Sequence, residues 1–207
     1  MAKTASPYGL RPVKKLGGAP YNNALREIKL STNNATAIFA GDVIQLTAAG
    51  NPQPLGATIT AGTTAGVVGV CQGVRYVNPG TKQPMWGRNL PANAITGGYT
   101  DVFVLVADDP ELVFQVQGSA AFGTLTNGAN GAVGKNAALG NFGAGNAATG
   151  NSGVNLVVGA NGASLAATPA LAVRIVEVVP GTELDPFPEL LVKFNGAAHS
   201  YNLATGV

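Results

Sequence analysis

Two apolar runs joined by a short acidic turn lie at the middle of the chain and constrain its fold most. Residues 102–107 and 112–117 are rich in Val, Leu and Phe, and they flank Asp108–Glu111, with the sequence DDPE. β-Branched and aromatic residues favour strands, whereas Asp-Pro favours a turn. Residues 102–106 are apolar throughout, so we expect that strand to be covered on both faces. We therefore predict a β-hairpin at the centre of an all-β domain.

Other short apolar runs separated by Gly, Pro, Asn and Asp extend this pattern along the chain. We expect further strands at 24–30, 42–47, 67–77, 154–158, 171–179 and 190–195. Many short strands, abundant turn residues and no convincing amphipathic helix predict a single β-barrel or jelly-roll-like β-sandwich domain over residues 24–198. Trp86, the single tryptophan, lies close to a turn, where a core position is the usual role and an interface position the alternative.

Ionic side chains are scarce in this chain of 207 residues. Charged residues make up 11% of it and the net charge is only +2, against about a quarter charged in an ordinary soluble domain. An isolated monomer with so little charge has poor protection against association. We interpret the composition as that of a protein whose surface is largely met by other protein; a self-sufficient monomer is the alternative.

The first 23 residues are basic and contain no carboxylate, and three prolines interrupt them. We predict an extended docking arm over residues 1–23 that orders against an acidic neighbour. A frayed terminus is the alternative. The candidate interface residues are the aromatic and basic side chains of this arm, namely Tyr8, Arg11, Lys14, Lys15 and Tyr21. The segment lacks the apolar core of a secretory signal, so we expect synthesis in the cytoplasm.

A long segment rich in Gly and Asn, residues 124–162, separates the central strands from the late ones. Lys135 is the single charged residue between Leu112 and Val173. We predict a long loop that folds onto the barrel or is ordered by a neighbouring subunit. Residues 199–207 form a polar C-terminal tail.

Catalytic and metal-binding patterns find little support. The chain has one His, His199, and one Cys, Cys71, so a zinc site of the usual ligand spacing is excluded. Cys71 lies in an apolar run and is predicted to be buried, whereas His199 in the polar tail is predicted to be solvated or at an interface. The carboxylates of Asp108–Glu111 are interpreted as turn residues. No span long enough to cross a membrane is present. We expect no enzyme activity and no cofactor.

The chain resembles the head decoration (cement) proteins of tailed bacteriophages in a series of blocks that follow the same order. These blocks are PYGLRPVKKLGGAPYN (7–22), AIFAGDVIQLTAAG (37–50), VVGVCQGV (67–74), ADDPELVFQVQ (107–117), GNAATGNSGVNL (145–156) and LLVKFNGAAH (190–199). None of them is a catalytic signature, so the resemblance rests on their order.

The resemblance implies a structural virion protein, assembled in the bacterial cytoplasm, that binds the outer surface of a phage capsid. It would bridge subunits of the major capsid protein, commonly as a homotrimer, without a small-molecule substrate, a membrane or direct nucleic-acid contact. A different virion or surface β-protein, such as a fibre or host-binding module, is the first alternative. A small-molecule-binding β-barrel, or an enzyme that uses His199, is the second.

Overall fold

A computed structural model describes residues 4–56, 66–123, 128–196 and 198–202. None of the helices that these residues form has the length and apolar character of a membrane-spanning segment. Regular structure consists of short strands and 3-10 helices (η). In chain order they are β1 (Arg11–Lys15), β2 (Arg26–Lys29), β3 (Ile38–Phe39), β4 (Val43–Leu46), β5 (Pro52–Pro54), β6 (Val67–Val77), β7 (Pro84–Gly87), β8 (Asn89–Leu90), β9 (Thr100–Ala107), β10 (Leu112–Gln117), η1 (Gly128–Ala132), β11 (Asn136–Gly140), β12 (Gly145–Asn146), β13 (Asn151–Ser152), β14 (Asn155–Val157), η2 (Ala160–Gly162), β15 (Val173–Val178), β16 (Glu189–Phe194) and η3 (Ser200–Asn202).

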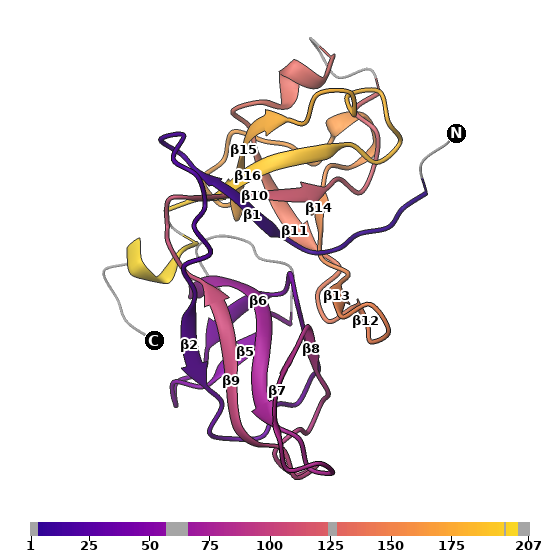
Figure 1. Cartoon of the computed structure of the whole chain (residues 1–207). Helices are drawn as coiled ribbons and strands as arrows, with labels where there is room; N and C mark the ends of the chain where they lie inside the picture. Colours follow the sequence, from indigo (N-terminus) through magenta and orange to yellow (C-terminus); the bar gives the residue numbers. More distant parts are fainter. Residues whose placement is uncertain (1–3, 57–65, 124–127, 197, 203–207) are drawn as a thin grey trace.

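Two six-stranded antiparallel sheets make up most of the fold (Figure 1). The upper sheet in that view has the order β1-β10-β16-β15-β11-β14. The lower sheet has the order β2-β9-β6-β4-β5, and β7 pairs with β6 beside this path. The described residues also form two small two-stranded ribbons, β3–β8 and β12–β13. The all-β prediction is confirmed, and the packed antiparallel sheets are consistent with a β-sandwich.

The apolar core is divided between the two sheets. The larger cluster takes Val43, Val70 and Ala107 from the lower sheet and packs them with upper-sheet residues such as Phe114 and Val192. A second cluster lies within the lower sheet, around buried residues that include Ile44, Cys71 and Val104. Since the larger cluster has members from both sheets, burial of apolar surface holds the sheets together. Cys71 is fully buried, as predicted.

The central hairpin prediction is wrong in its pairing. Both strands exist, as β9 and β10, but β9 pairs with β2 and β6 whereas β10 pairs with β1 and β16. The turn at Asp108–Glu111 therefore carries the chain from the lower sheet to the upper one. Turn chemistry fixes where the chain changes direction, but it does not decide which strands pair. On β9, Val104 and Val106 are fully buried while Phe103 and Leu105 are half-buried, so cover on both faces is incomplete.

The expected arm does not stand apart from the domain. Residues 11–15 form β1, which pairs with β10 at one edge of the upper sheet, with an irregularity between Pro12 and Lys14. Leu10 is fully buried in the larger core. A boundary after Asn23 therefore separates a strand from its own sheet. The proline at position 12 is tolerated because β1 is an edge strand.

The Gly/Asn-rich segment is also more ordered than the expected loop. Outside residues 124–127, which lie beyond the described residues, it contains η1, β11, β12, β13, β14 and η2. β11 joins the upper sheet between β15 and β14. Leu139 and Leu156, which pair across β11 and β14, are fully buried. The many small residues therefore gave little sequence signal for these strands, although their few apolar side chains are buried.

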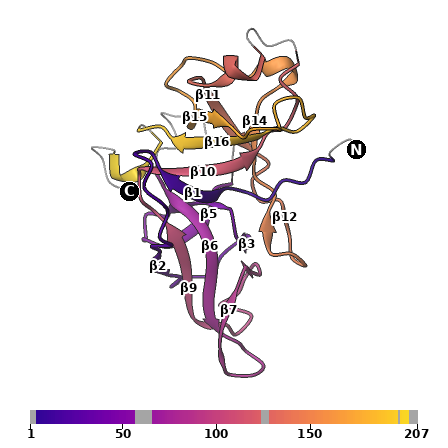
Figure 2. The same cartoon turned by 45° about the horizontal axis from the view of Figure 1, so that its top comes forward.

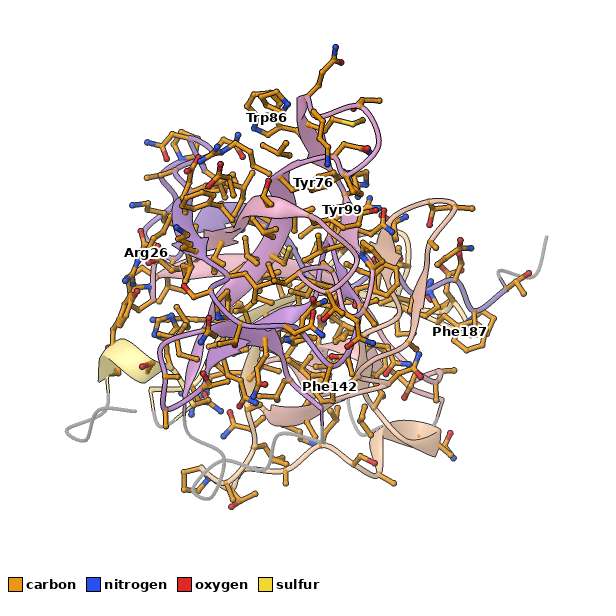
Figure 3. All side chains as sticks on the ribbon, turned by 90° about the horizontal axis from the view of Figure 1, so that it is seen from below. Arg26, Tyr76, Trp86, Tyr99, Phe142 and Phe187 are labelled. Carbon is orange, nitrogen blue, oxygen red and sulfur yellow. The ribbon has the colours of Figure 1, made fainter. Side chains whose placement is uncertain are left out.

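Trp86 is not a core residue. It lies on β7 opposite Arg75 of β6, and 68% of its surface is exposed. Figure 3 shows it at the outer end of the lower sheet, beyond the Tyr76 and Tyr99 rings. Those two rings pack edge to face, with 5.0 Å between their centroids. Tyr76 and Tyr99 pack against the core cluster of the lower sheet, whereas the Trp86 ring lies on the surface.

A close backbone crossing between the N-terminal segment and the lower sheet gives a stability prediction. Gly41 has a φ of +95°, and a Cβ there would lie 2.6 Å from the Tyr8 carbonyl oxygen, whereas Gly50 has a φ of +75° and open space around it. Gly50→Ala is expected to lower the free energy of unfolding by about 1 kcal/mol, the cost of a left-handed alanine. Gly41→Ala, which adds a steric clash, is expected to cost about 3 kcal/mol or more.

Urea unfolding of the two variants and the wild-type protein measures both effects. Equal losses at positions 41 and 50 would contradict the close crossing, since the backbone penalty is shared and the contact is not.

Candidate binding groove

A polar groove lies where the N-terminal segment, the β12–β13 ribbon and the lower sheet meet. Its main cavity has a volume of about 570 Å³, and an adjoining one of about 310 Å³ shares four lining residues with it. Those shared residues are Tyr8, Arg11, Thr149 and Asn151. Figure 2 shows the ribbon beside the lower sheet, on the side of the molecule to which the N-terminal segment runs. We call the two cavities together the arginine groove.

The N-terminal wall of the groove is fixed by backbone and side-chain contacts. The Leu10 N–H donates to the Gly41 carbonyl at 3.0 Å, at the glycine crossing described above. Further out, the Ser6 N–H donates to the Gln117 side chain at 2.9 Å, and the Tyr8 hydroxyl donates to the Glu189 carboxylate. Burial, and then Glu189, raises the pKa of Tyr8, so this hydroxyl keeps its proton at neutral pH. The Tyr8 ring is therefore held in place.

The opposite wall is the β12–β13 ribbon, which is hydrogen-bonded to Ala40 in the segment between β3 and β4. The Ala40 N–H donates to the Gly150 carbonyl at 3.0 Å, and the Ser152 N–H donates to the Ala40 carbonyl at 2.9 Å. Within the ribbon, the Asn146 side chain accepts from the N–H groups of Ala148 and Thr149 at 2.9 and 3.3 Å. An Asx turn of this kind sets the ribbon's tip. Thr149 and Asn151 are thereby presented to the groove.

A buried carboxylate lies beneath the ribbon. Asp42 is 1% exposed, and its two oxygens accept from the Ser152 hydroxyl at 2.5 Å and from the Phe39 N–H at 2.7 Å. Burial raises the pKa of Asp42 to about 6, although both hydrogen bonds oppose the shift. Asp42 thus joins the ribbon to the lower sheet at the cost of holding a poorly solvated charge at neutral pH.

Two arginines give the groove its charge. The Arg11 guanidinium lies 4.1 Å from the centre of the Tyr8 ring, and an Arg88 Nη donates to Asn151 Oδ1 at 2.6 Å. No carboxylate of the described residues forms an ion pair with either arginine. The described lining residues include no Asp, Glu, His or Cys. The groove therefore offers positive charge and hydrogen-bond donors, which suit a carboxylate-bearing ligand.

Of the five candidate residues from the sequence, three lie in this groove. Tyr8, Arg11 and Tyr21 line it together. Lys14 and Lys15 do not: Lys14 pairs with Glu177 at 3.0 Å and Lys15 with Asp109 at 2.6 Å, on the surface of the fold. The sequence missed Arg88 and the ribbon residues. An Asn-x-x-Thr turn signal was present at the ribbon, but nothing local marked Arg88 as a neighbour of the N-terminus.

The acidic turn acts as a structural junction. The Glu111 N–H donates to the Asp109 side chain at 2.8 Å, as expected of a turn residue. The carboxylates also bind groups from other elements: Asp108 accepts from the Tyr201 hydroxyl at 2.8 Å, and Glu111 pairs with Lys193 at 2.7 Å. The turn thereby connects both sheets and the C-terminal residues.

His199 contradicts the prediction that it is solvated or at an interface. It is 1% exposed, its ring lies edge to face with those of Phe194 and Tyr201, and its Nδ1 accepts from the Tyr201 N–H at 3.3 Å. Burial lowers the pKa of His199 against the opposing effect of Asp108. The described residues contain no group of His, Cys, Asp and Glu side chains suited to a metal ion. Residues 203–207 of the expected tail lie outside the described residues.

Comparison with known proteins finds no family model, no curated protein and no solved structure that matches the chain.

The buried Asp42 gives a pH prediction. A folded-state pKa of about 6 lies above the unfolded value of about 4, so the native state binds the proton more tightly. Asp42 therefore contributes its full stabilisation below pH 4. As the pH rises from 4 to 6 this contribution is lost, and the free energy of unfolding falls by about 3 kcal/mol. The difference in unfolding free energy between wild type and Asp42→Asn should fall across this window and be constant above it.

Urea unfolding between pH 4 and pH 8 tests this, with Asp101→Asn as a control that removes an exposed carboxylate. A difference between wild type and Asp42→Asn that does not change with pH would show that Asp42 is not held in a desolvated site.

Proposed function

We propose that this protein is a structural virion component that binds the outer surface of a phage capsid and bridges neighbouring major capsid protein subunits. The observation that carries the proposal is the arginine groove. It brings Tyr8, Arg11 and Tyr21 of the N-terminal segment together with Arg88, and no described carboxylate lines it. Acidic side chains on a capsid subunit are the complement to such a surface. The block order of the sequence and its low content of charge support the same function.

The physical role of such a protein is to hold neighbouring capsid subunits together, as a clip does. A capsid under internal pressure from packaged DNA is loaded at the junctions between its subunits. A protein that binds the assembled lattice and not its separated subunits stabilises the lattice by mass action at each site. Repetition over the shell multiplies modest contacts, because neighbouring sites raise the effective concentration of the clip.

We further propose that the protein works as a homotrimer on the virion, without catalysis or a cofactor. The two groove arginines can bind carboxylates but are too few to follow a nucleic-acid backbone, for which several phosphate contacts are usual. Assembly would take place in the bacterial cytoplasm, where capsids form.

Trp86 favours one alternative. Its exposed ring, beside Met85 on an edge strand, is the kind of surface with which a fibre or host-binding module contacts a receptor. Such a protein would be located at the tail, and changes at Trp86 rather than in the groove would abolish its binding.

Charge reversal in the groove tests the proposal. Arg11→Glu and Arg88→Glu are each expected to weaken binding to capsids that lack the protein by about tenfold or more, since a carboxylate would then face a carboxylate. Lys29→Glu is the matched control, with the same charge change at an exposed position on β2. Binding is measured by co-sedimentation with the capsids, and far-ultraviolet circular dichroism verifies the fold of each variant.

The same capsids provide a second measurement. Particles that carry the wild-type protein should withstand heat and low salt better than bare particles, and the Arg11→Glu protein should restore less of this resistance. Equal resistance of bare and decorated particles would refute the stabilising role. Equal binding by all three variants would refute the groove as the contact.

A further inference from the structure

The loop between β15 and β16 presents a leucine to solvent. Leu184 is 99% exposed, the most of any large apolar side chain among the described residues. It lies between Glu183 and Asp185, so an apolar side chain is flanked by two acidic ones. We call residues 183–185 the acidic knob. Exposure of the leucine side chain to water is unfavourable in free energy, and contact with another apolar surface would remove this cost.

The knob is held rigidly. The buried Thr182 hydroxyl donates to the Val179 carbonyl at 2.8 Å and accepts from the Glu189 N–H at 3.1 Å, which ties the two ends of the loop together. The Asp185 N–H donates to the Thr182 carbonyl at 3.0 Å. A loop braced in this way loses little conformational freedom on binding, which favours its use as a contact.

A cavity with an apolar lining and two basic side chains, complementary to the acidic knob, lies at the other end of β15 and β16. Its volume is about 290 Å³, enough for a leucine side chain, and its apolar lining comes from Leu16, Val176 and Phe194. Arg174 and Lys193 also line it. Lys193 already pairs with Glu111 at 2.7 Å, whereas Arg174 donates to Asn136 at 3.0 Å and pairs with no carboxylate of the described residues. We call this cavity the basic hole.

The positions of the knob and the hole prevent contact within one molecule. β15 and β16 are antiparallel neighbours, so the loop that joins them lies at one end while Arg174 and Phe194 lie near the other (Figure 1). Strands of this length separate the two ends by about 20 Å. An acidic knob that fills this hole must therefore belong to a second copy of the chain.

We propose that copies of this protein associate head to tail, with the acidic knob of one in the basic hole of the next. Leu184 packs against Leu16, Val176 and Phe194, and the Glu183 carboxylate pairs with Arg174. The two contacting surfaces differ, so the contact is heterologous and forms a ring where the rotation closes. This inference deepens the self-association part of the proposed function and is independent of the arginine groove.

Sedimentation equilibrium of the isolated protein tests the contact. Leu184→Ser is expected to lower the association constant by about tenfold or more, because a buried leucine contributes at least that factor. The unfolding curve should not change, since Leu184 makes almost no contact within its own chain. Val133→Ser, at another exposed apolar position, is the control and should leave association unchanged.

The ion pair is tested by reversal and exchange. Arg174→Glu and Glu183→Arg should each weaken association by about tenfold, and the double variant should recover most of the loss, as coupled charges do. A wild-type protein that is monomeric at about 100 μM, or a Leu184→Ser variant that associates as wild type does, would overturn the contact. Both results come from protein without capsids, so they are distinguishable from a failure of capsid binding.

Discussion

The backbone junction at Ala40–Asp42 is the constraint on which the rest of the structure depends. The N-terminal segment, the β12–β13 ribbon and β6 all donate or accept hydrogen bonds at these three residues, over 2.7 to 3.0 Å. Glycines at positions 9 and 41 allow the two backbones to cross where a Cβ would collide. Asp42 then fixes the ribbon from below through Ser152. The arginine groove exists because three segments distant in sequence meet at one short stretch of buried backbone.

The charges of the acidic turn and those of the arginine groove differ in whether they are paired within the molecule. The carboxylates of the acidic turn bind cations from other elements, namely Lys15 and Lys193 of the upper sheet and Arg26 of the lower sheet. Exposed pairs of this kind contribute little stability each, so their main effect is to occupy charges within the molecule. Arg11 and Arg88 have no such partner among the described residues. In a protein with so little charge, these two arginines in one polar groove are the basis of the proposed contact with an acidic surface.

Local sequence patterns predicted the strands well and their pairing poorly. β6 lies at 67–77 as expected, because β-branched residues and flanking turns are local signals. The hairpin at Asp108–Glu111 was wrong, because β9 and β10 each have better partners in different sheets. Within the Gly/Asn-rich segment β14 was expected, but β11 and the β12–β13 ribbon were missed, because the few apolar residues of β11, such as Leu139, are buried by packing that composition does not reveal. Tyr8 and Arg11 were predicted as contact residues, but Arg88 becomes their neighbour through the fold alone.

The role of the groove is tested most directly by a cryo-electron microscopy reconstruction of capsids that carry the protein, at a resolution that shows side chains. Our proposal predicts density at regular positions over the shell, with an acidic segment of the major capsid protein between Arg11 and Arg88. Density confined to the tail, or a groove that faces solvent on the assembled particle, would contradict it.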